Sequence, residues 1–138
     1  MKIAIVDGMG GGIGSQVAAR LRPILRGQDT LIALGTNAAA TGVMIKSGAT
    51  TGASGENAIV VTAPTADVII GPVGIIMPNS LLGEITPAIA VAIASCKAIK
   101  ILVPLVQPHV ELVGLEARPL SATLDDVAAR VEELLKKS

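Results

Sequence analysis

The sequence predicts an α/β domain, a three-layer sandwich in which helices cover both faces of a mostly parallel sheet of about five or six strands. Short apolar runs typical of buried strands alternate with segments of helical periodicity along the chain. This alternation favours parallel strands joined by right-handed crossovers, because a parallel connection needs a long return segment. Apolar residues make up 51% of the 138 residues, so the chain can bury the core of one domain spanning residues 1–138.

The first expected unit is a strand, a glycine-rich loop and a helix. The strand is predicted at residues 3–6, and Asp7 follows it. Glycine then occupies positions 8, 10, 11, 12 and 14. A helix should begin directly after the loop, because apolar residues recur at helical spacing, at Ile13, Val17, Leu21 and Leu25. We expect Pro23 to kink or shorten the last turn of this helix and Gly27 to stop it.

A second strand and helix are expected next. Residues 30–34 form the strand, and Thr36 or Asn37 should cap a helix that runs to about residue 47. Gly48 is a suitable C-terminal stop for this helix, because glycine adopts the conformation that ends helices without steric cost.

Two segments in the middle of the chain leave alternatives open. Residues 48–57 are small and polar, which suits a short third strand, a flexible lid, or both. Residues 57–63 could form a strand or a short helix. We favour the helix, because a strand here would lie only four residues from the next predicted strand, at residues 67–71, too close for a parallel crossover.

Two strands and a helix are predicted in the following part of the chain. Thr86 and Pro87 suit a helix start, because threonine can cap the first turn and proline presets its backbone. The helix itself, residues 88–95, contains almost only Ala, Ile and Val. It is therefore expected to be buried, either between layers or at a subunit interface. Residues 99–105 form the next central strand, and residues 110–115 a final strand.

The last helix is expected to begin near Ser121 or Thr123. Thr123 and Asp126 have the spacing of a capping box, with Asp in place of the usual Glu or Gln. Its core face would be formed by Leu124, Val127, Val131, Leu134 and Leu135.

Polar loops follow the predicted strands, and parallel strands end at a common edge of the sheet. Four loops should therefore meet there, at residues 7–15, 35–37, 71–84 and 107–109. Ligands of such sheets bind at this edge, so we expect the site to be there.

The glycine loop predicts a small phosphate-containing ligand, with NAD(P) or another nucleotide as the possible cofactor. Glycine lets the backbone approach an anion closely, and the start of a helix supplies free N–H groups and a positive partial charge. The alternative is a turn that only packs a helix tightly against the sheet. The residues expected to bind the nucleotide are Asp7, Gly8, Gly10, Gly11, Gly12, Ile13, Gly14, Thr36, Asn37, Asn79 and Ser80.

The loop departs from the common dinucleotide fingerprint in two ways. The pattern G-x-G-x-x-G, begun at Gly8, would need glycine where Ile13 stands. Dinucleotide-binding units also carry an acidic residue near the end of the second strand, which binds the ribose. Here Thr36 and Asn37 occupy that place and would bind it more weakly.

Three other residues are candidates for chemistry. Asp7 could hydrogen-bond the N–H groups of its own loop or hold a Mg²⁺ ion beside phosphates. Glu84 is a candidate general base, or a charge that stabilises the start of the following helix. His109 is the only histidine and could transfer protons, or serve as a structural hydrogen-bonding residue. One His and one Cys make a zinc site very improbable, so no metal site is predicted.

Composition argues against several classes of protein. Eleven basic and eleven acidic residues cancel, and Phe, Tyr and Trp are absent, which argues against nucleic-acid binding. Residues 68–83 carry no charge, but glycines and prolines interrupt them, so no membrane span is expected. A single cysteine and an N-terminus without a signal-like segment favour a cytoplasmic protein.

Six segments together resemble an uncharacterised bacterial group, domain-of-unknown-function family 3842: DGMGGGIG, ALGTNA, GENAIVV, DVIIGP, NSLLGEITP and ILVPL. The resemblance covers nearly the full length and implies a Rossmann-like fold but no reaction. The loop itself, G-x-x-x-G-I-G, is similar to that of short-chain dehydrogenases. Those enzymes use a Tyr-x-x-x-Lys pair, and a chain without tyrosine cannot use their mechanism.

These observations leave three functions open. The first is a nucleotide- or dinucleotide-binding protein with the phosphates on the glycine loop. The second is an enzyme acting on a small anionic metabolite, with Glu84 or His109 as the acid–base group. The third is a non-catalytic regulatory module that forms a homo-oligomer through the apolar helix at residues 88–95.

Overall fold

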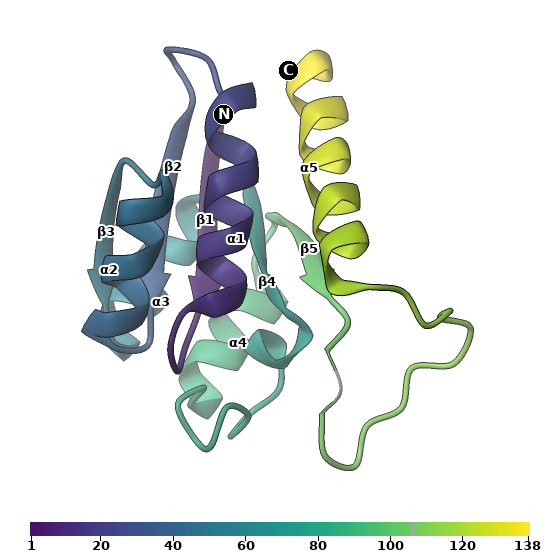
Figure 1. Cartoon of the computed structure of the whole chain (residues 1–138). Coiled ribbons are helices and arrows are strands. Elements are labelled where there is room, and N and C mark those ends of the chain that lie inside the picture. The colour runs from purple at the N-terminus through teal and green to yellow at the C-terminus, as the bar shows by residue number, and fades with distance from the viewer. Residues whose placement is uncertain (106) are drawn as a thin grey trace.

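The computed structural model describes residues 1–105 and 107–138 and has a five-stranded parallel sheet at its centre (Figure 1). The strands are β1 (Lys2–Asp7), β2 (Thr30–Gly35), β3 (Thr51–Ser54), β4 (Val68–Pro72) and β5 (Ile99–Val103). They lie in the order β3-β2-β1-β4-β5, and every neighbouring pair is parallel. The predicted α/β class and the parallel sheet are therefore confirmed.

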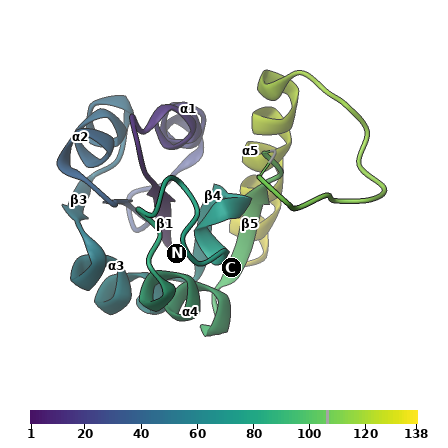
Figure 2. The same ribbon diagram turned by 90° about the horizontal axis from the view of Figure 1, so that it is seen from below.

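Helices cover both faces of the sheet, as Figure 2 shows. On one face lie α1 (Gly12–Leu21), α2 (Ala38–Ser47) and α5 (Leu120–Lys137), and on the other lie α3 (Glu56–Thr62) and α4 (Pro87–Ser95). The chain winds outward from β1 to β3 and then crosses to β4 on the other side of β1. This is a Rossmann-like, doubly wound arrangement whose switch point lies between β1 and β4.

The central strand β1 shows why the sheet is buried on both faces. Ile3 and Ile5 face the layer of α1, α2 and α5, whereas Ala4 and Val6 face the layer of α3 and α4. All four side chains are fully buried. Alternate side chains of a strand point to opposite faces, so an unbroken apolar run is needed where helices cover both.

The expected helix caps after β2 and before α4 are present. The side-chain oxygen of Asn37 accepts a hydrogen bond from the amide of Ala40 over 2.8 Å and so caps α2. Gly48 ends α2 with a φ of 144°. Thr86 caps α4 by accepting a hydrogen bond from the amide of Ile89 over 3.2 Å.

The structure decides between the alternatives for both middle segments, and the favoured helix is confirmed. Residues 51–54 form the short third strand, β3, at the edge of the sheet. Residues 56–62 form the helix α3, which a single 3₁₀ turn, Ala63–Thr65, continues before β4.

Two helix boundaries differ from the predictions. The first helix ends at Leu21 and not at Gly27, because Pro23 enters a 3₁₀ turn, Arg22–Ile24, that replaces the last α-helical turn; the expected shortening by Pro23 is confirmed. The last helix begins at Leu120, directly after Pro119, and has no side-chain cap. The predicted capping box of Thr123 and Asp126 is therefore wrong, and Asp126 instead pairs with Arg118.

The predicted final strand at residues 110–115 is also wrong. Residues 107–119, here called the arm, form an extended excursion that leaves the end of β5 and returns to the start of α5 (Figures 1 and 2). The only bridge in the described part of the arm joins Gln107 and Val110. Because the arm leaves and rejoins the body at the same edge of the sheet, its apolar side chains meet no second layer, and Val113 is 97% exposed.

The apolar helix α4 is buried on one side only. Ile89, Ala90 and Ile93 pack against the sheet, but Val91 on the opposite side is 62% exposed. No helix within residues 1–105 and 107–138 is long and apolar enough to span a membrane.

Candidate functional site

The glycine loop connects the end of β1 to the first turn of α1. Met9 and Gly11 adopt left-handed backbone conformations, with φ of 51° and 72°. The amide of Gly11 donates to the carbonyl of Gly8 over 2.9 Å, which closes a tight turn. The turn places the N-terminus of α1 at the carboxyl edge of the sheet.

Three of the five loop glycines are required by packing. A Cβ atom at Gly8 would lie 2.7 Å from Oγ1 of Thr36, and one at Gly11 would lie 2.8 Å from the backbone of Ala40 in α2. A Cβ atom at Gly14 would collide with the sulfur of Met44. At these positions the packing explanation of the glycine loop is sufficient.

Gly10 and Gly12 are different. A Cβ atom at either position would meet no atom of the described chain within 4 Å, and neither residue has a positive φ. Both residues are exposed, and their amides donate to no acceptor in residues 1–105 or 107–138. Neither packing nor backbone conformation explains a glycine at these two positions.

A cavity of about 270 Å³ lies over the loop, and Gly10 and Gly12 line it. The ends of β1 and β4, the first turns of α1 and a residue after β5 contribute further walls, so the cavity opens at the switch point of the sheet. Besides the loop glycines, its lining includes Asp7, Met9, Ile13, Gln16, Pro72, Leu81 and Leu105.

Asp7 lies beneath the loop and is only 4% exposed. Its carboxylate accepts hydrogen bonds from the amides of Gly8 and Gly14, over 2.8 and 2.7 Å. Burial raises the pKa of Asp7 above its usual value, although these two hydrogen bonds act in the opposite direction. Of the two roles expected for Asp7, the hydrogen bonding of its own loop is therefore present in the structure.

Glu84 reaches the same loop from the segment between β4 and α4. It accepts hydrogen bonds from the amide of Met9 over 2.5 Å and from the side-chain amide of Asn37 over 2.9 Å. Partial burial alone would raise the pKa of Glu84, but hydrogen bonds to its carboxylate, led by those from Asn37 and Met9, together hold the pKa below its usual value. The carboxylate is thus directed at the glycine loop and not at the start of α4.

Thr36 and Asn37 follow β2 but have different surroundings. Asn37 uses its side chain fully: the oxygen caps α2, and the nitrogen donates to Glu84 and to the carbonyl of Met9. Oγ1 of Thr36 is buried and has no hydrogen-bond partner among the described residues. Asn37 therefore positions other groups and has no free donor for a ligand.

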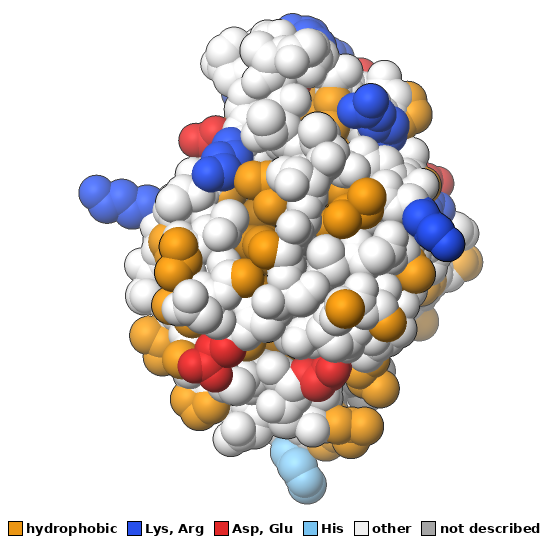
Figure 3. All heavy atoms as spheres, turned by 90° about the vertical axis from the view of Figure 1, so that its left-hand side faces the viewer, with side chains coloured by type: hydrophobic (Ala, Val, Ile, Leu, Met, Phe, Trp, Pro, Cys, Tyr) orange, Lys and Arg blue, Asp and Glu red, His pale blue; other side chains and the backbone are white. Residues whose placement is uncertain are grey.

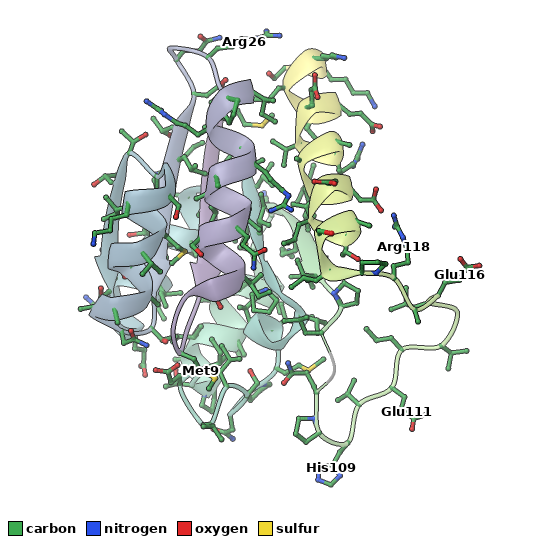
Figure 4. All side chains as sticks on the ribbon, in the orientation of Figure 1. Met9, Arg26, His109, Glu111, Glu116 and Arg118 are labelled. Atoms are coloured by element: carbon green, nitrogen blue, oxygen red, sulfur yellow. The ribbon has the colours of Figure 1, made fainter. Side chains whose placement is uncertain are left out.

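The remaining predicted site residues line a neighbouring cavity of about 640 Å³. Asn79, Ser80 and His109 border it, and Met9 borders both cavities. The hydroxyl of Ser80 donates to the carbonyl of Gly74 and so ties its own loop together. His109 is exposed on the arm, and Figure 4 shows its ring pointing away from the body.

Sequence reasoning missed several residues that line the 270 Å³ cavity. Gln16 lies one helical turn after Gly12, so helical spacing could have identified it. Pro72 ends β4 and Leu105 follows β5, so the topology could have identified both. Leu81 carries no such signal, because its position depends on how residues 77–86 fold back over the loop.

Basic side chains are absent from the loops after β1, β2 and β4. The sequence has no Lys or Arg at residues 3–19, 27–45 or 71–96, which include the loops after β1, β2 and β4. In Figure 3 the basic side chains lie in the upper half of the face, whereas the histidine lies at its lower end. Figure 4 shows Arg26 at the end of the molecule opposite Met9. An anion at the loop would therefore be bound by backbone amides.

Metal ligands are not grouped at the site: in the described residues no three His, Cys, Asp or Glu side chains lie close enough together to hold an ion. A family model described as a domain of unknown function (DUF3842) matches residues 2–136. No curated protein matches the chain.

Proposed function

The chain belongs to the DUF3842 family, whose description names no activity, and from the geometry of the loop we propose that it binds a nucleotide or dinucleotide by its phosphates. The observation that carries this proposal is the contrast among the loop glycines. Gly8, Gly11 and Gly14 are required by packing, whereas Gly10 and Gly12 face an open cavity with unpaired amides. A ligand that approaches the backbone closely accounts for the last two.

The first turn of α1 supports an anion in this cavity. The first N–H groups of a helix have no partner within the helix, and its dipole places a positive partial charge there. Together these features make a helix N-terminus suited to phosphate. The cavity also lies at the switch point between β1 and β4, where open parallel sheets bind their ligands.

The charges around the loop favour a particular kind of phosphate. Terminal phosphates carry nearly two negative charges and are normally met by Lys, Arg or Mg²⁺. The loops after β1, β2 and β4 contain no Lys or Arg, and two carboxylates, Asp7 and Glu84, are close by. A pyrophosphate diester, with one charge on each phosphate, suits this surrounding better than a triphosphate. Dinucleotides such as NAD⁺ are therefore the favoured ligands.

The test compares Gly12→Val with the matched control Gly42→Ala. Gly12 lies in the cavity, and Gly42 is exposed in α2; an added Cβ meets no atom within 4 Å at either position. We expect NAD⁺ to raise the midpoint of thermal unfolding of the wild type and of Gly42→Ala, because a ligand of the folded state stabilises it by mass action. Gly12→Val should unfold near the wild-type temperature without ligand and lose the shift.

Two results would contradict the proposal. One is an equal ligand-induced shift in Gly12→Val and in the wild type. The other is no shift of the wild type with NAD⁺, NADP⁺ or ATP, each measured with and without Mg²⁺. In that case Gly10 and Gly12 do not form a nucleotide site.

An acid–base role gains less support. Glu84 is held by two hydrogen bonds and has a lowered pKa, so it remains ionised and acts as an acceptor. His109 points away from the glycine loop (Figure 4). The cytoplasmic location expected from the single cysteine remains a prediction.

A separate observation supports the second candidate function, a non-catalytic module that forms a homo-oligomer. The arm carries Leu112, Val113 and Leu115, which are 46%, 97% and 57% exposed. A hollow of about 620 Å³ lies between the arm and the body, lined in part by Val103, Leu105 and Leu120. One chain thus offers both a projecting apolar segment and an apolar hollow. In a symmetric dimer, the segment of each copy could pack into the hollow of the other.

A further inference from the structure

An acidic side chain lies near the carboxyl end of β2, although the sequence has no acidic residue directly after this strand. In a dinucleotide-binding unit an acid near this strand end binds the hydroxyls of the ribose. The chain has Thr36 and Asn37 there. Glu84, 47 residues further along the chain, brings its carboxylate to within 2.9 Å of the side-chain amide of Asn37.

We propose that Glu84 accepts hydrogen bonds from the 2′- and 3′-hydroxyls of a bound nucleotide, so that the site selects a ribose with a free diol over one with a 2′-phosphate. This inference rests on the proposed nucleotide binding at the glycine loop and names the specificity of that site.

The carboxylate of Glu84 lies beside the cavity of about 270 Å³ over the glycine loop. Met9 lines this cavity, and its amide donates to Oε1 of Glu84 over 2.5 Å. A nucleotide can therefore place its phosphate on Gly10 and Gly12 and its ribose at Glu84 if it extends past Met9 toward β2. In the described structure each carboxylate oxygen accepts one N–H group, and an ionised carboxylate can accept further hydrogen bonds.

The surrounding residues hold this carboxylate in place. Asn37 is fixed at both ends, since its oxygen caps α2 and its nitrogen also donates to the carbonyl of Met9. A Cβ atom at Gly8 would lie only 2.8 Å from Oε1 of Glu84. The first glycine of the loop thus leaves the space that Glu84 occupies, which links the glycine pattern to the position of the acid.

The negative charge of Glu84 would disfavour a ligand with a 2′-phosphate. Such a phosphate would place about two negative charges against an ionised carboxylate. The loops after β1, β2 and β4 hold no Lys or Arg to compensate. A diol instead donates two hydrogen bonds to a charged acceptor, which are stronger than bonds to a neutral one.

The experiment is isothermal titration calorimetry with NAD⁺ and NADP⁺ on the wild type, Glu84→Gln and Glu56→Gln. Glu56 is an exposed acid at the start of α3, at the same edge of the sheet, and serves as the matched control. We expect the wild type and Glu56→Gln to bind NAD⁺ at least tenfold more tightly than NADP⁺. In Glu84→Gln the NAD⁺ affinity should fall about tenfold and the preference should disappear.

Further arms separate the outcomes. If Glu84→Gln does not fold, the wild type alone tests the inference. It should bind 2′-deoxy-ADP several-fold more weakly than ADP. Equal wild-type affinity for NAD⁺ and NADP⁺, or an unchanged preference in Glu84→Gln, overturns the inference and leaves the proposed binding standing. If NAD⁺, NADP⁺, ADP and ATP all fail to bind, the inference and the proposed function fail together.

Discussion

Glu84 accepts a hydrogen bond from the side-chain amide of Asn37, with 2.9 Å between Oε2 and Nδ2. Asn37 caps α2, and Glu84 belongs to the segment that leads into α4. The pair therefore joins two segments that precede helices on opposite faces of the sheet, directly beside the glycine loop.

The Glu84 contacts predict a pH-dependent contribution to stability. The pKa of Glu84 is lower in the folded chain than its usual 4.5, so its stabilising effect is present above that value and is lost as the pH falls through the folded pKa. At neutral pH, Glu84→Gln should lower the free energy of unfolding by about 1 kcal/mol, because one N–H group loses its acceptor. Urea unfolding at pH values above and below 4.5 measures this. A difference from wild type that does not shrink in acid would contradict the assignment.

Asp7 should show the opposite pH dependence. Its pKa is raised above 3.8 by burial, so this group stabilises the folded chain increasingly as the pH falls from the folded pKa toward the unfolded one. Asp7→Asn removes this dependence and turns an NH₂ group toward the amide of Gly8 or Gly14. We expect a loss of about 1–3 kcal/mol at neutral pH, measured by urea unfolding. Wild-type stability in Asp7→Asn would show that these hydrogen bonds contribute nothing.

The loop glycines predict a contrast between two alanine substitutions. Gly14→Ala forces a Cβ atom against Met44 in the core and should cost about 1–3 kcal/mol of unfolding free energy. Gly12→Ala places its Cβ in open space at the first position of α1, and its effect should stay within about 0.5 kcal/mol. Thermal unfolding of both variants checks the difference. Equal destabilisation would mean that Gly12 is also required by packing.

The arm predicts a concentration-dependent mass in solution. Light scattering of the wild type should give more than the 13.8 kDa of one chain, and Val113→Asp should return the mass toward that of one chain. Val113 is 97% exposed, so the charge would not disturb the fold of a single chain. Val61→Asp, at a position 62% exposed on α3, is the control and should keep the wild-type mass. A wild type of 13.8 kDa at every concentration rules out assembly through the arm.

The strands β1, β2, β4 and β5 and the starts of α2 and α4 could be predicted because local rules determine them. The apolar run in β1 is unbroken since both faces are covered, and the Thr86–Pro87 pair starts α4 by cap and backbone geometry alone. The topology predicts that the loops at residues 35–37 and 71–84 meet, but the hydrogen bond between Glu84 and Asn37 could not be predicted, because it depends on how the segment after β4 folds over the loop. The apolar residues at 110–115 predict a buried strand, but burial also needs a neighbouring layer, which the sequence pattern does not reveal.

The lack of Lys and Arg in the loops after β1, β2 and β4 also affects the kinetics of binding. Basic clefts attract anionic ligands from a distance, and added salt slows such association. Here Asp7 and Glu84 are the charges nearest the loop, so an approaching anion meets weak repulsion until the backbone amides bind it. Added salt screens this repulsion, so the association rate constant for an anionic ligand should rise with ionic strength.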